Sequence, residues 1–180
     1  MINIVAYQAV WFAVVASAGH GRAALGMGAT VFFVAAQLAL SRQRLSDVRL
    51  IAAALTCGVA IDGMLSFCGW LRYASPEPAF PPHGAPLWIL CLWAAFSLTL
   101  TRSLAWLMRR LWLAILLGAL GGPLAYVSAA RGFAAVELVP PIARGFAGLA
   151  LGWGAALGVL AYLARREHAG AAAALIEARP

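Results

Sequence analysis

Apolar residues fill most of the chain in six long runs, and short polar stretches separate these runs. A helix of about 20 predominantly apolar residues is long enough to cross the hydrocarbon core of a bilayer. The pattern therefore predicts an all-α fold, namely a polytopic transmembrane bundle of about six helices in a single domain over residues 1–164, with a short cytoplasmic tail at 165–180. The expected spans lie near residues 2–18, 23–40, 48–70, 87–106, 111–130 and 143–163.

Composition supports this class and argues against nucleic-acid binding. The 180 residues are 64% hydrophobic and only 11% charged, whereas soluble domains contain roughly 25% charged residues. The net charge of +7 comes from 13 basic residues that are all arginine. These arginines lie between the apolar runs and do not form one continuous basic face, as nucleic-acid binding would need.

The distribution of arginine predicts the orientation of the chain. Cytoplasmic loops of membrane proteins are enriched in Arg and Lys. With the N-terminus inside, nine arginines fall on the cytoplasmic side and four on the other, which places both termini in the cytoplasm. The nine are Arg42, Arg44, Arg49, Arg102, Arg109, Arg110, Arg165, Arg166 and Arg179, and the four are Arg22, Arg72, Arg131 and Arg144.

The longest connection, residues 71–86, contains five prolines. Proline lacks a backbone N–H and disrupts both helices and paired strands. We expect this segment to be an ordered cap or a surface loop, with neither a regular helix nor a paired strand running through it.

Asp62 is the strongest functional candidate, because it is the only carboxylate deep inside an apolar run. A charged group within a membrane span is costly unless it faces a partner or a wet cavity. Counting about 1.5 Å per residue from Leu50 places it about 18 Å from the cytoplasmic edge, slightly past the middle of the membrane. One interpretation is a structural Asp hydrogen-bonded to a neighbouring side chain, and the other is a proton relay or substrate contact.

Two further polar residues are candidates. Arg102 lies about one turn inside the inner boundary, where its side chain either extends to the phosphate level or pairs with an anionic lipid or substrate group. Tyr126 lies one turn after Gly122 and is the natural hydroxyl to meet Asp62 if the third and fifth spans are adjacent.

The string Gly121-Gly122-Pro123 predicts a kink or short break in the fifth span. Proline removes a backbone donor and clashes with the preceding turn. Such breaks line binding cavities in some membrane proteins and only fit a bundle together in others, and both interpretations stay open.

Gly148, Gly152, Gly154 and Gly158 form two small-xxx-small patterns in the last span. Small residues let helix backbones approach closely, either within the bundle, which we favour, or at a homo-oligomer interface. The three cysteines lack metal-ligand spacing, and we expect no metal and no cofactor.

Four strings occur in a characteristic order: GVAID at 58–62, PLWILCLW at 86–93, SLAWL at 103–107 and GALGGPLAY at 118–126. With them the chain resembles a family of small bacterial inner-membrane proteins classed as domain of unknown function 2878. The resemblance implies a multi-pass protein of the bacterial inner membrane. It also implies an association with fatty-acid or lipid modification, hence membrane lipids and a lipid-modifying enzyme as partners.

Three functions follow as hypotheses. The first is an accessory or lipid-binding component of lipid modification, because no catalytic motif is present. The second is a small proton-coupled transporter or flippase that uses Asp62. The third, an intramembrane lipid-modifying enzyme, needs several converging polar groups and ranks last, so we lean against an enzyme.

Overall fold

The computed structural model describes residues 2–177, with side chains described for residues 3–166. This part of the chain is all-α with four very short strands, which confirms the predicted fold class. The elements are α1 Ile2–Gly19, α2 Ala23–Ala39, α3 Arg44–Phe67, β1 Leu71–Tyr73, β2 Ala79–Phe80, β3 Ala85–Pro86, α4 Leu87–Leu100, α5 Ala105–Met108, α6 Leu111–Phe133, β4 Val136–Leu138 and α7 Ile142–Glu177.

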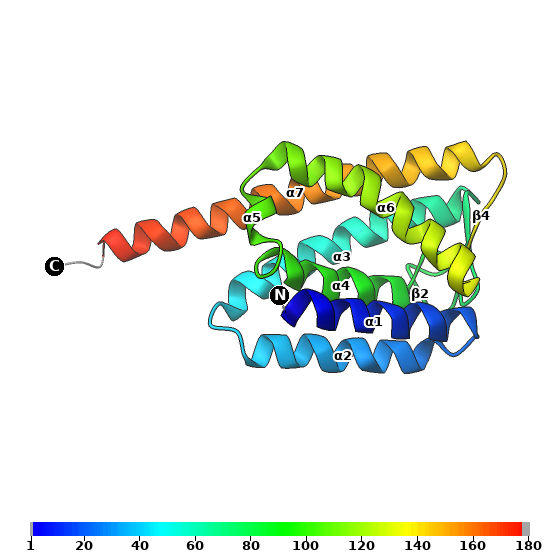
Figure 1. Ribbon diagram of the computed structural model, residues 1–180, viewed down its shortest axis with the longest axis horizontal. Helices are drawn as coiled ribbons and strands as arrows, with labels where there is room; N and C mark the ends of the chain where they lie inside the picture. Colours follow the sequence, from blue (N-terminus) through cyan, green and yellow to red (C-terminus); the bar gives the residue numbers. More distant parts are fainter. Residues whose placement is uncertain (1, 178–180) are drawn as a thin grey trace.

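The six long helices α1, α2, α3, α4, α6 and α7 lie side by side in one bundle, and the chain runs up and down along it (Figure 1). The short strands gather at one end, which we name the strand end. The short helix α5 and the α2–α3 turn lie at the other, the α5 end. Helix α7 packs on both α6 and α3, and α1 packs on α2. Beyond the bundle α7 continues as helix to Glu177, so the helix includes residues of the expected tail at 165–180.

Three described helices are long and apolar enough to cross a membrane, namely Arg44–Phe67, Leu111–Phe133 and the Ile142–Arg166 part of α7. In each, only 33% of the span is buried inside the protein. Their outward faces are therefore apolar and exposed, as expected where lipid covers a protein. Helices α1, α2 and α4 are apolar but shorter.

Helix α4 lies at the centre of the bundle. It contacts α1, α2 and α3, and ten of its 14 residues are buried. A helix that is apolar on all sides belongs in an interior. The expected span 87–106 is too long, because α4 ends at Leu100. There the carbonyl of Thr99 accepts the backbone N–H groups of Arg102 and Leu104 in a turn that leads to α5.

Helix α3 also ends before the predicted boundary at residue 70. Gly69 takes the left-handed conformation, with φ of 65°. The N–H of Trp70 bonds to the carbonyl of Leu65, and the N–H of Gly69 bonds to that of Ser66. This pattern is the Schellman motif, which stops a helix at a glycine. Asp62 therefore lies five residues from the end of α3, near the strand end and not at mid-helix.

The segment 71–86 is an ordered cap, but the expectation that it contains no paired strand is wrong. Strand β1 pairs antiparallel with β4, and β2 pairs antiparallel with β3. β1 precedes the first proline, and the β2–β3 ladder is only two residues long, with Pro86 in its last pair. Proline is tolerated in such short edge strands because few ladder donors are needed.

Candidate functional site

Asp62 is fully buried, with 0% of its surface exposed, although its helix faces outward over most of its length. Its neighbours on α3 leave room around the carboxylate. Gly58 lies one turn earlier against the Trp93 ring, and Gly63 lies beside the backbone of Ala85 in β3. The missing side chains at these glycines let α4 and the cap approach α3 closely.

Three side chains donate hydrogen bonds to the Asp62 carboxylate. The Tyr73 hydroxyl donates to Oδ1 at 2.9 Å, and Trp93 Nε1 donates to Oδ2 at 2.7 Å. The Tyr126 hydroxyl also donates to Oδ1. Burying a carboxylate without such donors costs several kcal/mol. We name Asp62 and these three donors the carboxylate cage.

The three donors come from separate elements: β1, α4 and α6. Tyr73 lies outside the helices, and its burial, followed by the neighbouring Asp62 charge, raises the pKa of its phenol well above the usual value. Tyr73 therefore keeps its proton and stays a donor at any physiological pH. Trp93 is a donor only. The cage thus connects the cap, the central helix and α6 to one point on α3.

The sequence led us to expect that Tyr126 would meet Asp62 if the third and fifth spans were adjacent, and in the structure the two side chains are joined by this hydrogen bond. Helix α6 packs mainly on α7, and α3 packs on α4 and α7, so the long tyrosine side chain bridges the remaining gap. Among the alternatives for Asp62, the geometry matches the structural one, a carboxylate held by neighbouring side chains.

Arg102 lies at the opposite end of the bundle and does not reach Asp62. Its Nη2 bonds to Oδ2 of Asp47 at 3.0 Å and to the carbonyl of Gln37 at 3.2 Å. The Asp47 side chain is 5% exposed and that of Arg102 is 26% exposed. Thr101 adds a longer contact of 3.4 Å to Asp47 Oδ1. The anionic partner of Arg102 is therefore a carboxylate of the protein itself.

Sequence reasoning missed Asp47, Tyr73 and Trp93 as partners. Asp47 belongs to the first turn of α3 and is flanked by arginines, a pattern that normally indicates a solvated helix start. Tyr73 follows a helix end, and only the β1–β4 pairing turns it inward. Trp93 lies in an apolar run, where an aromatic side chain usually packs between helices, and the signal for its second role was the glycine at position 58.

The Gly121-Gly122-Pro123 string does not break its helix, because α6 is continuous through Pro123. Gly122 packs against the side chain of Trp153, and Gly118 packs against the backbone there. Gly121 is different: a Cβ atom at this position would meet nothing within 4 Å. Both interpretations of the string therefore find support. Gly122 allows close packing in the bundle, and Gly121 faces open space.

The four glycines of the last span all make contacts within the chain. Gly148 and Gly152 lie against Leu65 and Ile61 of α3. Gly154 and Gly158 lie against Ile115 of α6. Packing inside the bundle thus accounts for their small size.

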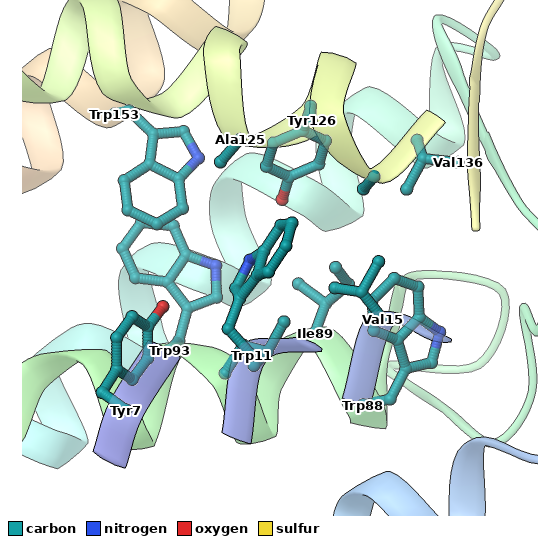
Figure 2. A pocket seen from close by; sticks show the side chains of 12 residues that line it. Tyr7, Trp11, Val15, Trp88, Ile89, Trp93, Ala125, Tyr126, Val136 and Trp153 are labelled. Carbon is teal, nitrogen blue, oxygen red and sulfur yellow. The ribbon is translucent and has the colours of Figure 1, made fainter. Parts of the chain in front are cut away.

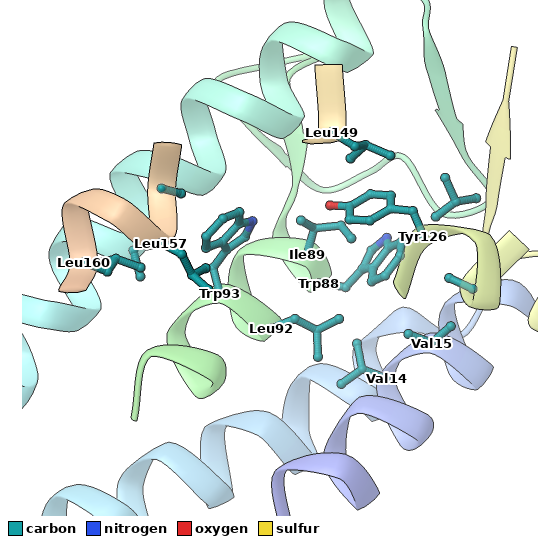
Figure 3. Packing of buried hydrophobic residues seen from close by; sticks show 14 of the residues in the cluster. Val14, Val15, Trp88, Ile89, Leu92, Trp93, Tyr126, Leu149, Leu157 and Leu160 are labelled. Carbon is teal, nitrogen blue, oxygen red and sulfur yellow. The ribbon is translucent and has the colours of Figure 1, made fainter. Parts of the chain in front are cut away.

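An aromatic cavity of about 50 Å³ adjoins the carboxylate cage (Figure 2). Trp93 and Tyr126 belong to both. Trp153 stacks on Trp93 with ring centroids 4.0 Å apart, and the Tyr7 hydroxyl points into the cavity. The Trp153 indole N–H lies near the Tyr126 hydroxyl, yet it is buried and makes no hydrogen bond with any described residue. Packed apolar side chains such as Leu149 and Leu157 of α7 surround this region (Figure 3).

A larger groove of about 730 Å³ lies between α1 and α6 and shares Tyr7, Trp11, Ala125 and Trp153 with the cavity. The two helices touch at the strand end, where Gly19 meets the Phe133 carbonyl. From that contact toward the α5 end the two helices separate, and the groove lies between them. Phe96, Trp153 and Leu157, from α4 and α7, also line the groove. Asp62 does not line it.

Residues 1–159 match the model of a family described as "Protein of unknown function (DUF2878)". The chain belongs to this family. The match covers all of α1–α6 and most of α7 within the bundle, so both the cage and the groove are features of the DUF2878 region. A comparison with curated proteins finds no match, and neither does a comparison with solved structures.

Proposed function

We propose that this DUF2878 protein is a multi-pass protein of the bacterial inner membrane that binds lipid and supports membrane lipid or fatty-acid modification as an accessory component. The proposal retains six spans and places both termini in the cytoplasm, as the arginine distribution predicts. The observation that carries lipid binding is the groove between α1 and α6.

The groove has the size and walls that an acyl chain needs. Along α6 its lining extends from Leu117 to Phe133, which is about 24 Å at 1.5 Å per residue. One leaflet of the hydrocarbon core is about 15 Å deep. Apolar and aromatic side chains dominate the lining, and Gly121, whose Cβ position meets nothing within 4 Å, leaves the wall formed by α6 open there. A lipid chain entering sideways from the bilayer would bury its surface against this wall.

The position of Asp62 favours this proposal over transport and catalysis. A proton-coupled transporter needs a path from a central carboxylate to both faces. Here the carboxylate is fully buried and three protein donors occupy its oxygens. An enzyme needs the acid or base to face its substrate, but Asp62 lines neither the aromatic cavity nor the groove. A stabilising role for Asp62 and a binding role for the groove fit these facts together.

Filling the groove tests the proposal. Gly121→Leu adds a side chain that projects into the groove, because nothing lies within 4 Å of its Cβ position. Gly28→Leu on α2 is the matched control, since Gly28 is also open and lines none of the cavities described. Both substitutions raise helix propensity by a similar amount. Lipid that remains bound after purification in detergent is counted by native mass spectrometry.

We expect Gly121→Leu to lose most of the bound phospholipid and Gly28→Leu to keep it. In a strain that lacks the protein, the native chain and Gly28→Leu should restore the cellular lipid profile, whereas Gly121→Leu should not. Equal lipid retention by the native chain and both variants would overturn the proposed lipid groove. An unchanged lipid profile in the deletion strain would remove the role in lipid modification.

A further inference from the structure

The groove is not uniform along its length, because one cationic side chain lies at its strand end. Arg131 belongs to the last turn of α6, and both its side chain and that of Gln8 line the groove. Gln8 is uncharged and lies on α1, in the half of that helix toward the α5 end, away from Arg131. A charged group therefore marks one end of a predominantly apolar groove, and the remaining walls continue away from it toward Leu117.

Arg131 has no partner among the described side chains. Within residues 3–166 its guanidinium makes no hydrogen bond and no ion pair, and the side chain is exposed. The nearby carboxylate of Glu137 pairs instead with Arg72, at 3.7 Å. An arginine in the last turn of a helix interacts favourably with the helix dipole. That interaction explains a cation at this turn, but it does not explain why the cation borders a groove.

The depth of Arg131 matches the headgroup level of a membrane. It lies two residues from the end of α6, at the same end as the cap. From Arg131 to Leu117 the groove extends along 14 residues of α6, about 21 Å. A lipid whose polar group binds at Arg131 can thus place an acyl chain along the rest of the groove.

From these relations we infer that the groove binds an anionic phospholipid, with the lipid phosphate at Arg131 and one acyl chain between α1 and α6. This inference rests on the proposed lipid groove and adds the chemistry of its headgroup. A guanidinium forms paired hydrogen bonds with phosphate oxygens, and the bond is strengthened by charge on both partners. A zwitterionic lipid offers the same phosphate but adds a cationic group beside Arg131, which repels the guanidinium.

The test compares two phospholipids on variants of the full chain. Purified protein is exposed to mixed micelles that contain phosphatidylglycerol and phosphatidylcholine with the same acyl chains in equal amounts, and bound lipid is identified by native mass spectrometry. The variants are Arg131→Gln and, as a second form, Arg131→Lys. Arg22→Gln is the matched control, because Arg22 is also exposed, lies at the strand end and does not line the groove.

For the native protein and Arg22→Gln we expect phosphatidylglycerol to be enriched about tenfold over phosphatidylcholine, because both lipids offer the phosphate but only phosphatidylcholine adds a cationic group that repels Arg131. Arg131→Gln should bring the ratio close to one while keeping the total amount of bound lipid, and Arg131→Lys should keep most of the enrichment. Equal binding of both lipids to the native protein, or unchanged enrichment in Arg131→Gln, would overturn the headgroup assignment.

The two proposals fail in different ways. If Gly121→Leu still loses lipid but Arg131→Gln keeps the native ratio, the groove stands and the headgroup assignment is wrong. If Gly121→Leu keeps its lipid, the groove itself is wrong. If the Arg131→Gln protein does not accumulate, the Arg131→Lys protein provides the test. Lysine keeps the positive charge, so a loss of phosphatidylglycerol enrichment in Arg131→Lys would contradict recognition by charge.

Discussion

The indole ring of Trp93 lies directly against Gly58, one helical turn before Asp62. A Cβ atom at Gly58 would lie 2.5 Å from Trp93 Cδ1 and 2.8 Å from its Nε1. The same Nε1 donates to Asp62 at 2.7 Å. The space at Gly58 is thus what allows α4 to present its donor to the buried carboxylate.

This relationship predicts that even Gly58→Ala is harmful. The added methyl group must displace the indole and so weaken its bond to Asp62, and overpacking of this kind costs about 1–3 kcal/mol. The measurement is thermal unfolding in detergent followed by circular dichroism. Gly28→Ala, which meets nothing within 4 Å, should not lower the stability. Equal unfolding temperatures for the two variants would contradict the role of Gly58.

Two tryptophans that stack on each other allow the hydrogen bond to be measured separately from the packing. Trp93→Phe and Trp153→Phe each keep an aromatic ring in the stack and remove a similar volume. Trp93→Phe also removes a bond to the carboxylate, whereas the Trp153 N–H has no bond to lose among the described residues. We expect Trp93→Phe to cost about 1.5–3 kcal/mol more in unfolding free energy. A larger loss in Trp153→Phe would show that stacking, and not the cage, dominates.

Substitutions of Asp62 should affect stability before they affect function. Asp62→Asn keeps one acceptor oxygen but turns an N–H group toward a donor, and we expect a loss of about 1.5–3 kcal/mol. Asp62→Ala leaves all three donors without an acceptor and should cost more.

The same variants test the alternative functions in cells. Asp62→Asn protein that accumulates normally in the membrane should restore the lipid profile of a deletion strain, since the carboxylate does not line the groove. Failure to restore the profile at normal abundance would instead support proton coupling or catalysis by Asp62.

The surroundings of Asp62 show how much of the site the sequence alone could predict. The apolar run around Asp62 made it an outlier, and the turn spacing in α6 identified Tyr126 as its partner. The other partners depend on contacts that hydropathy does not encode. Tyr73 is brought inward by the pairing of two three-residue strands, in which it lies opposite Val136, 63 residues later in the chain. The groove likewise follows from how far α1 and α6 separate, which no local pattern specifies.

The pair of Arg102 and Asp47 should be energetically coupled, because both side chains are largely buried at the α5 end. Removing either partner leaves the charge of the other without its oppositely charged neighbour. A double-mutant cycle with Asp47→Ala and Arg102→Ala should give a coupling energy of about 1–3 kcal/mol. The exposed pair of Arg72 and Glu137, at 3.7 Å, is the control and should give less than about 1 kcal/mol. Similar coupling in both pairs would mean that burial adds nothing to the inner pair.

The native cysteines offer a test of the proposed orientation. Cys68 is exposed at the strand end, whereas Cys57 and Cys91 are only partly exposed within helices. If the N-terminus lies in the cytoplasm and the first three helices all cross the membrane, Cys68 faces the periplasm. A membrane-impermeant maleimide should then label Cys68 in intact spheroplasts. Gln43→Cys in a Cys68→Ala background, at the exposed start of α3, should react only after the membrane is opened. The reverse pattern would invert the topology and place Arg131, with the headgroup that we propose it binds, in the inner leaflet.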